Sequence, residues 1–193
     1  MPRPSVREKL VETALECFQD QGFNGCGVQD ITDAAGVPKG SFYNHFKSKE
    51  ALAVEVLARY AETNRLDMLE DAGMPPLARL RANFQFLADR IEGWAFTRGC
   101  LLGNFGCETS DSNPAIREAM SLKLAHWAEL LGRVLREAQA QGALDRHYDP
   151  ALLARHLIYA WEGAVTAAKV IKSRQPMDDF FKINFDTLLA GSA

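Results

Sequence analysis

The stretch 27–52 constrains the fold most, because two apolar stripes at helical spacing flank a single glycine there. Val28, Ile31 and Ala35 fall on one side of a helix and give it a face that can be buried. Gly36 follows directly and supplies the left-handed backbone with which many helices end. The pattern predicts a short helix that stops at a tight turn.

A second short helix is predicted after that turn. Pro38 suits its first turn, because the N–H that proline lacks would have no helical partner there. Phe42 and Phe46, four residues apart, turn inward together as its core face. The side chains off this stripe have the length and the hydrogen-bonding groups that suit base edges and phosphates, and they are Lys39, Ser41, Tyr43, Asn44 and His45.

Residues 34–52 read Ala-Ala-Gly-Val-Pro-Lys-Gly-Ser-Phe-Tyr-Asn-His-Phe-Lys-Ser-Lys-Glu-Ala-Leu, preceded by Gly22-Phe23 and Val28-Gln29-Asp30-Ile31. Together they resemble the helix-turn-helix of the tetracycline-repressor (TetR) family. The resemblance implies a DNA reader whose third helix enters the major groove. It implies that bases or backbone are approached by Gln29, Lys39, Gly40, Ser41, Tyr43 and Asn44, and that phosphates are held by His45 and Lys49.

Some positions in this segment have a second interpretation. Gln29 and Asn44 suit a solvated surface equally well. Cys26 and Gly27 stand where the TetR pattern more often has a hydroxyl residue that caps the second helix, and Gly27 caps less well than a hydroxyl residue. Lys49 falls in the first turn of a fourth predicted helix, where the helix dipole and the ammonium would act together on a phosphate.

Charge is distributed unevenly along the chain. There are 22 Lys and Arg against 25 Asp and Glu, a net charge of −3, which argues against a protein that coats nucleic acid nonspecifically. Within 36–49, however, the only formally charged residues are Lys39, Lys47 and Lys49. A local cationic surface on an acidic body suits a protein that docks on DNA in one orientation.

We expect a soluble, cytoplasmic protein with no membrane partner. The N-terminus has no apolar run of the kind that a signal peptide needs. No apolar segment approaches the ~20 residues of a membrane span, and the richest one, 151–161, contains Arg155 and His156. The four cysteines are expected to be reduced in this compartment.

The rest of the chain is predicted to be all-α, because apolar residues keep helical spacing in every later segment. Asn113-Pro114 and Asp149-Pro150 each place a capping side chain before a proline and predict two helix starts. We predict three parts: an N-terminal three-helix helix-turn-helix DNA-binding domain over 1–52, a linker helix over 48–71, and a larger helical effector-sensing and dimerisation domain over 53–193.

The segment 99–109 is unusual, because Gly99, Gly103 and Gly106 each disfavour helix by about 1 kcal/mol. It is predicted to be a weak helix. Cys100 and Cys107 would lie about 10 Å apart along its axis, too far for a disulfide, and their spacing is not a zinc pattern. The simplest interpretation is a close helix crossing with two inert buried thiols.

A second resemblance gives this segment a sharper interpretation. Gly99-Cys100-Leu101, Tyr-Ala-Trp-Glu-Gly-Ala at 159–164 and Ala-Ala-Lys at 167–169 resemble the regulatory domain of the N-ethylmaleimide-reductase repressor branch of the TetR family, whose members sense electrophiles and oxidants. The resemblance implies that Cys100 is a sensor with Lys169 close to it. A nearby ammonium stabilises the thiolate, which is the form that reacts.

The competing interpretation is a pocket for a non-covalent effector. Aromatic linings suit small apolar ligands, although plain core packing explains the same residues. The candidates are Phe84, Trp94, Phe105, Trp127 and Tyr159.

Two later helices are predicted to meet their copies across a two-fold axis as a four-helix bundle, through Ala160, Gly163, Ala164 and Ala167 on one and Phe181, Phe185 and Leu188 on the other. The two helix-turn-helix domains, one from each chain, which we call the reading heads, would then face one DNA duplex. The operator is therefore expected to be an inverted repeat.

These patterns predict a repressor of the TetR type that releases its operator when a small ligand binds or when a sensor cysteine is modified by an electrophilic inducer. An activator of the same fold, and a ligand- or redox-sensing module without control of DNA, remain alternatives. No catalytic, cofactor-binding or metal-ligand motif is recognised, so no enzyme, cofactor or metal is expected.

Overall fold

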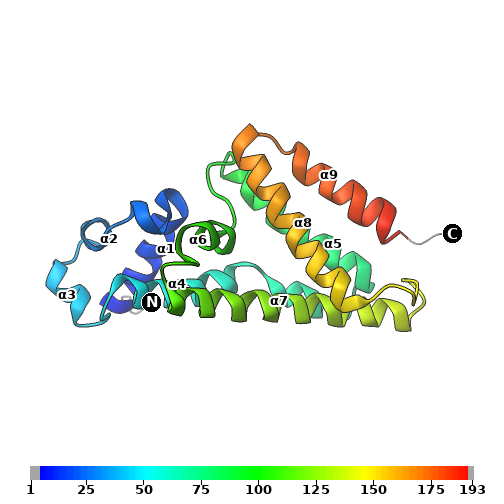
Figure 1. Ribbon diagram of the computed structural model, residues 1–193, viewed down its shortest axis with the longest axis horizontal. Helices are drawn as coiled ribbons and strands as arrows, with labels where there is room; N and C mark the ends of the chain where they lie inside the picture. The colour runs from blue at the N-terminus through cyan, green and yellow to red at the C-terminus, as the bar shows by residue number, and fades with distance from the viewer. Residues whose placement is uncertain (1–4, 191–193) are drawn as a thin grey trace. The chain divides into compact units, whose positions relative to one another are not determined.

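A computed structural model of the chain describes residues 5–190, and these residues form helices joined by turns, without a strand (Figure 1). The predicted all-α class is confirmed. In chain order the elements are α1 (Val6–Gly25), α2 (Val28–Ala35), α3 (Lys39–Tyr43), α4 (Lys49–Thr63), the 3-10 helix η1 (Leu66–Glu70), α5 (Pro76–Gly93), α6 (Leu101–Thr109), α7 (Pro114–Ala140), α8 (Pro150–Ile171), α9 (Gln175–Ile183) and the π-helical turn η2 (Asn184–Leu188).

The chain folds as two compact units. The first unit contains the chain up to Thr63 together with Leu101–Leu122, and the second contains Asn64–Cys100 together with the chain from Lys123 onward. This division differs from the domains predicted at 1–52 and 53–193, because α4 and α6 both pack with α1 in the first unit. The functional domain boundaries therefore stay a prediction.

The ends of α1 and α2 are set by local interactions. The Ser5 hydroxyl accepts a hydrogen bond from the Glu8 N–H (3.2 Å) and the Glu8 carboxylate accepts one from the Ser5 N–H (2.8 Å), so the two residues form a capping box that begins α1. Gly36 has φ 62° and ψ 40°, and its N–H donates to the last carbonyls of α2. It is the predicted left-handed cap.

The linker helix predicted over 48–71 is shorter in the structure. α4 ends at Thr63, Arg65 has a left-handed backbone with φ 50°, and the chain continues as η1. The amide nitrogen of Asn83, which is buried on α5, donates to the carbonyl oxygens of Asn64 and Arg65, both at 3.0 Å. A side chain distant in sequence thus engages the carbonyls at this turn, which no local pattern reveals.

The two helix starts predicted at Asx-Pro pairs are both present. The Asn113 side chain accepts from the N–H of Ile116 at the start of α7. The Asp149 carboxylate accepts from the N–H groups of Ala151 and Leu152 at the start of α8. Each capping side chain satisfies N–H groups that a helix start leaves free.

Aromatic rings build the core of the second unit. Phe84 of α5 is fully buried, and four rings have centroids 5.1–6.0 Å from its own: Trp127, Trp161, Phe180 and Phe185. Phe181 packs against Phe185 at 5.8 Å and is also buried. The prediction that Phe181 and Phe185 face a second copy of the chain is therefore wrong, because the aromatic side of α9 and η2 faces the core of their own unit.

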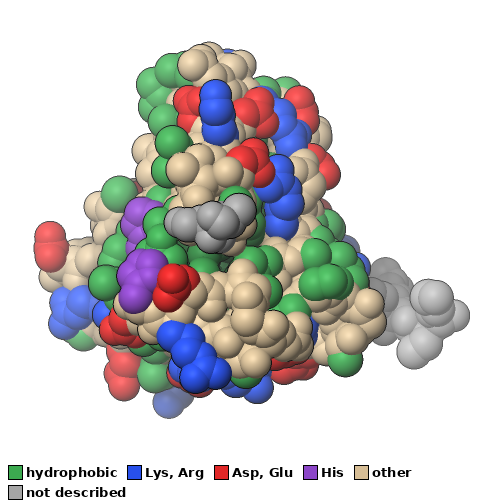
Figure 2. Space-filling view, turned by 90° about the vertical axis from the view of Figure 1, so that its right-hand side faces the viewer, with side chains coloured by type: hydrophobic (Ala, Val, Ile, Leu, Met, Phe, Trp, Pro, Cys, Tyr) green, Lys and Arg blue, Asp and Glu red, His purple; other side chains and the backbone are tan. Residues whose placement is uncertain are grey.

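Charges of both signs share the surface. On the face drawn in Figure 2, Lys and Arg side chains lie among Asp and Glu, as the nearly balanced composition leads one to expect. Within residues 5–190, none of the helices combines the length and the apolar character needed to cross a membrane.

Candidate nucleic-acid interface

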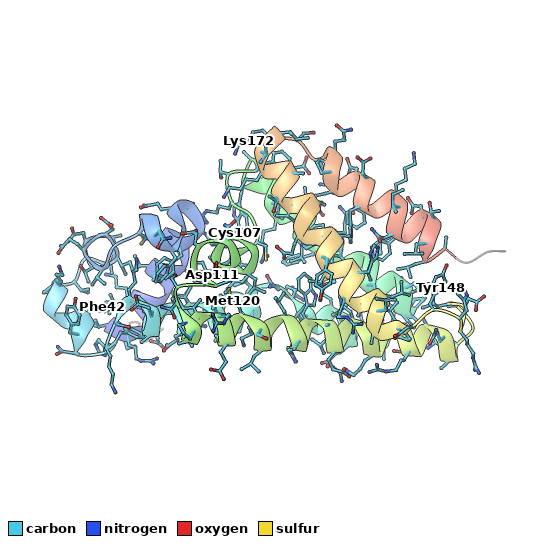
Figure 3. The ribbon with its side chains drawn as sticks, viewed as in Figure 1. Phe42, Cys107, Asp111, Met120, Tyr148 and Lys172 are labelled. Atoms are coloured by element: carbon cyan, nitrogen blue, oxygen red, sulfur yellow. The ribbon has the colours of Figure 1, made fainter. Side chains whose placement is uncertain are left out.

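The short helix α3 is held by its aromatic side. Phe42 and Phe46 are buried with ring centroids 5.7 Å apart, and Figure 3 marks Phe42 on α3. The Tyr43 ring meets Phe42 edge-on at 5.2 Å while the residue as a whole stays exposed. α3 ends at Tyr43, so only Phe42 belongs to the helix, while Phe46 anchors the chain just beyond it. The two buried rings together fix the orientation of residues 39–46.

The residues predicted to read DNA lie on α3 and on the turn that follows it, where Asn44 and His45 are found. Ser41 is half-buried, and Lys39, Gly40, Tyr43, Asn44 and His45 are exposed. A β-carbon built on Gly40 would meet nothing within 4 Å, so this position leaves open space beside Lys39. The structure thus gathers six of the eight candidates on one short, well-anchored segment.

Gln29 lies on α2 and is exposed, but its amide nitrogen donates to the carboxylate of Asp33 at 2.7 Å. This hydrogen bond fixes the orientation of the amide and places a negative charge next to it. The amide oxygen and the second N–H of the amide remain for a contact with DNA.

Lys49 has a partner within the protein that the sequence did not indicate. Its Nζ donates to the carbonyl oxygens of Phe23 (2.9 Å) and Cys26 (3.1 Å) and lies 4.0 Å from the centroid of the Phe23 ring. The ammonium thus joins the start of α4 to the junction between α1 and α2, and one of its three N–H groups remains for the predicted phosphate contact, which stays a prediction. The sequence did not show this, because the partners are 23 and 26 residues away.

The end of α1 is held by α6, which sequence reasoning missed. Gly22 interrupts α1 with φ 77° and ψ 175°, and two residues later the Asn24 N–H donates to the carboxylate of Glu108 at 2.8 Å. Glu108 thereby supplies an acceptor to an N–H group freed by the break in the helix. The signal in the sequence was Gly22 within an otherwise helical run.

Phe105, also on α6, was expected in an effector pocket of the larger domain. It is instead fully buried in the first unit, with ring centroids 5.4 Å from Phe18 and 5.7 Å from Phe23. Three aromatic rings thus join α6 to the last two turns of α1. The sequence indicates an aromatic residue in a helical segment, but it does not say which neighbouring helix its ring meets.

Two cysteines near α2 and α3 have thiols whose pKa is raised. Burial raises the pKa of the Cys26 thiol to about 12 and also raises the pKa of the Cys17 thiol. Because the thiolate is the reactive form, neither sulfur is suited to sense electrophiles near neutral pH. Both are packing residues beside the α1–α2 junction.

Cys100 is buried in the second unit, 7% exposed, and its thiol hydrogen-bonds to the carboxyl group of Glu162 on α8. Burial raises the pKa of Glu162, while the hydrogen bond from Cys100 lowers it. Lys169 lies on the same helix, seven residues beyond Glu162 and half-buried. Glu162 belongs to the sequence motif at 159–164, but nothing in that motif indicates that its carboxyl group lies beside the thiol of Cys100.

The remaining aromatic candidates do not surround one pocket. Phe84 and Trp127 are core residues, Trp94 is half-buried beside the guanidinium of Arg90 at 5.2 Å, and Tyr159 is 66% exposed on α8. The expectation of a shared aromatic lining that includes Phe105 and Tyr159 is therefore wrong. Helical spacing placed these residues on helices but could not tell core from surface.

Family comparison covers most of the chain in two parts. Residues 10–56 match the model described as "Bacterial regulatory proteins, tetR family", and residues 76–183 match "Tetracyclin repressor-like, C-terminal domain". The first match contains α2, α3 and the start of α4, and the second contains α5 to α9.

Two curated relatives are similar over nearly their full length. The HTH-type transcriptional repressor DhaR of Mycobacterium sp. (strain GP1) is 39% identical over 192 residues, 98% of this chain and 95% of that protein. The HTH-type transcriptional repressor NemR of Escherichia coli K12 is 31% identical over 177 residues, 90% of this chain and 89% of that protein.

Solved structures agree with these matches. A regulatory protein TetR from Rhodobacter sphaeroides superposes with a TM-score of 0.86 at 33% identity and covers 92% of this chain and 95% of its own. The reduced form of E. coli NemR superposes with a TM-score of 0.85 at 28% identity and covers 97% of this chain and 99% of its own.

Proposed function

Because this chain belongs to the TetR family of bacterial transcriptional regulators, we propose that it is a repressor that binds an inverted-repeat operator as a homodimer and releases it on induction. As a member of this family it is a DNA-binding regulator and not an enzyme. The observation that carries the proposal is the exposed polar side of α3, fixed in orientation by the buried rings of Phe42 and Phe46.

The DNA contacts are proposed to divide between two kinds of side chain. Tyr43 and Asn44 have groups that meet base edges, whereas Lys39 and His45 are placed to meet phosphates or the bases beside them. Gly40 and Ser41 allow the backbone of α3 to approach the groove closely, because neither has a long side chain. Lys49 is proposed to join the start of α4 to the α1–α2 junction through the carbonyl groups of Phe23 and Cys26.

A second copy of the chain is proposed to cover an exposed apolar surface on α8 and α9. Five large apolar side chains there are 53–75% exposed, namely Leu152, Tyr159, Val170, Ile171 and Ile183. Exposed apolar groups on neighbouring helices are typical of an interaction surface. A two-fold axis through this surface would present two reading heads to one duplex, with half-sites one helical turn or a multiple of it apart.

Induction is proposed to act in the second unit, through covalent modification of Cys100 or through a non-covalent ligand. Similarity to NemR, whose structure is described as a reduced form, supports the cysteine. Adjacent Glu162 can accept the thiol proton when the sulfur adds to an activated alkene and then return it to the α-carbon of the adduct. Lys169 on the same helix would favour the thiolate if its ammonium approaches the sulfur.

The test is a selection of binding sites from random duplex DNA, repeated after treatment of the protein with a quinone. An inverted repeat should be enriched from untreated protein and lost after treatment. Cys100→Ser should bind the same operator and resist the quinone, while Cys107→Ser, which removes an exposed thiol on α6, should respond as the wild type does. Enrichment of single half-sites by a monomer would overturn the dimeric repressor, and quinone release of Cys100→Ser would overturn the sensor.

Two alternatives predict other outcomes. An activator of this fold would enrich the same operator in the selection but would raise transcription from it in a reporter assay, whereas a repressor would lower it. A ligand- or redox-sensing module without control of DNA would enrich no sequence.

A further inference from the structure

The second unit contains a pocket that the proposed function does not use. It has a volume of about 340 Å³ and lies between η1, α5 and α7. We call it the η1–α5–α7 pocket, and its lining residues are Leu69, Glu70, Arg79, Leu130, Arg133, Val134 and Glu137. Three of these side chains are apolar and four are charged, and this volume lies at the low end of the ~300–1,000 Å³ typical of small-molecule sites.

Arg79 is the central polar group of this pocket. The residue is 4% exposed, and its Nη1 donates to the carbonyl oxygen of Leu69 at 3.0 Å. Its Nε is buried and has no hydrogen-bond partner among residues 5–190. Nε and Nη2 together form the edge of a guanidinium that holds a carboxylate through two parallel hydrogen bonds.

A carboxylate of the chain already occupies half of that edge. Glu137 Oε2 pairs with Nη2 at 2.5 Å, while Nε has no acceptor. The Glu137 side chain is 43% exposed and can turn toward solvent, whereas Arg79 is buried. A carboxylate aligned to meet both Nε and Nη2 would satisfy a donor that Glu137 leaves without an acceptor, and would gain on replacing it.

The rim of the pocket adds a second cation. Arg133 of α7 pairs with Glu70 of η1 at 3.1 Å, and both side chains are more than half exposed. The pocket therefore has two arginines and two glutamates. A monocarboxylate adds one negative charge to this pocket, and the displaced Glu137 carboxylate moves into solvent, where its repulsion is screened. A phosphate would add about two negative charges beside both glutamates and is disfavoured.

We propose that the η1–α5–α7 pocket binds a small monocarboxylate with an apolar tail. The carboxylate takes the place of Glu137 on the Nε and Nη2 edge of Arg79, with Arg133 beside it. The tail packs against Leu69, Leu130 and Val134. This site is separate from Cys100. It names a chemical class for the non-covalent ligand, and for its effect on DNA it rests on the proposed function.

The pocket lies next to the segment that leads into the second unit from α4. Arg79 holds η1 through the Leu69 carbonyl, and Asn83 holds the two residues that precede η1. An occupant of the pocket therefore acts on the residues that follow Thr63, the last residue of α4, in the chain. Binding of a monocarboxylate is expected to alter the affinity for DNA through this connection.

The experiment is isothermal titration calorimetry of the full chain with hexanoate, and with hexanamide as the uncharged analogue. Hexanoate should saturate one site per chain and hexanamide should bind at least tenfold more weakly, because it lacks the charge that two arginines recognise. Arg133→Gln should weaken hexanoate about tenfold. Glu137→Gln should tighten it, because the competing carboxylate is gone.

Arg136→Gln is the matched control, since Arg136 is on the same helix, is also about half exposed and pairs with Glu129 outside the pocket. It should bind hexanoate as the wild type does, and so should Cys100→Ser. Equal binding of hexanamide and hexanoate, no saturation by hexanoate, or an equal loss in Arg133→Gln and Arg136→Gln would each overturn the proposal. None of these outcomes depends on the operator, so the repressor function is tested separately.

Discussion

Single side chains of the first unit divide into those that lie free on its surface and those that hold it together. Lys39 is exposed on α3, whereas the ammonium of Lys49 is bound by two backbone carbonyls and by the face of the Phe23 ring. Both residues are lysines in one cationic stretch of sequence. Their physical roles differ because only one of them meets carbonyl groups of another element.

Substitution of these two lysines separates the roles. Lys49→Ala is expected to lower the free energy of unfolding by about 1–2 kcal/mol, because it removes two hydrogen bonds and the interaction with the Phe23 ring. Lys39→Ala should leave it within about 0.5 kcal/mol but reduce the slope of log K against log salt by about 0.9 for each phosphate that the lysine neutralises. Urea unfolding and operator binding at several salt concentrations measure both. Equal losses of stability would contradict the structural role of Lys49.

Glu162 is expected to link stability to pH. Burial raises its pKa in the folded protein above the ordinary value of 4.5, so the folded state keeps a proton that the unfolded state releases. The stabilisation from this proton is fully present below pH 4.5 and is lost as the pH rises through the raised pKa.

The isosteric variant Glu162→Gln should remove this dependence. As the pH rises from 4.5, the free energy of unfolding of the wild type should fall relative to that of the variant, measured by urea unfolding at a series of pH values. Parallel curves for the two proteins would show that the carboxyl group does not titrate in this way.

Among the helices, α1 and α6 show how an element can be specified by a distant partner. Gly22 breaks α1 with a backbone that only glycine adopts readily, and Glu108 of α6 accepts from an N–H group just after the break. Phe105 packs its ring against Phe18 and Phe23. The end of α1, which leads to the reading helices, is therefore held by α6.

Two glycine substitutions test this arrangement. Gly22→Ala should cost about 1–3 kcal/mol of unfolding free energy, because φ 77° with ψ 175° is strained for alanine and because its Cβ would overlap the carboxylate of Glu108. Gly106→Ala on α6 is the control: its Cβ would meet nothing within 4 Å, so better helix propensity should stabilise the protein by up to about 1 kcal/mol. Urea unfolding measures both, and a neutral Gly22→Ala would refute the argument.

In the molecule as a whole, the chain passes between the two units three times, at 63–64, 100–101 and 122–123. One passage is the peptide bond after Cys100, where α6 begins, and another lies within the continuous helix α7. A change at Cys100 therefore acts directly on the helix whose Phe105 and Glu108 hold the end of α1. Covalent connection thus supplies a route from the proposed sensor to the reading head.

Assembly of two chains is tested through the exposed apolar surface of α8 and α9. Tyr159→Asp should shift the protein from dimer to monomer in sedimentation without unfolding it, since Tyr159 is 66% exposed and a buried carboxylate at an interface is costly. Operator affinity should fall with it. Leu122→Asp changes a side chain on α7 that is 65% exposed, and it should leave the dimer intact. A dimeric Tyr159→Asp would place the interface elsewhere.

The amino-acid sequence by itself determined the helical class, the helix-turn-helix and the helix ends at Ser5, Gly36, Asn113 and Asp149. These features depend on side chains and backbone groups within a few residues of one another, so the local sequence is enough to predict the interactions that form them. The exposure of the α3 residues followed from the same logic, because Phe42 and Phe46 fix which side is buried.

Only the tertiary structure decided which distant groups meet. It placed Lys49 on the carbonyls of Phe23 and Cys26, Phe105 in the first unit, Glu162 beside Cys100, and Phe181 in a core rather than at an interface. The spacing of apolar residues shows that one face of a helix is apolar. It does not show which other apolar face of the chain packs against it. Which apolar faces pack together depends on close packing of the whole chain, and no single segment of the sequence specifies it.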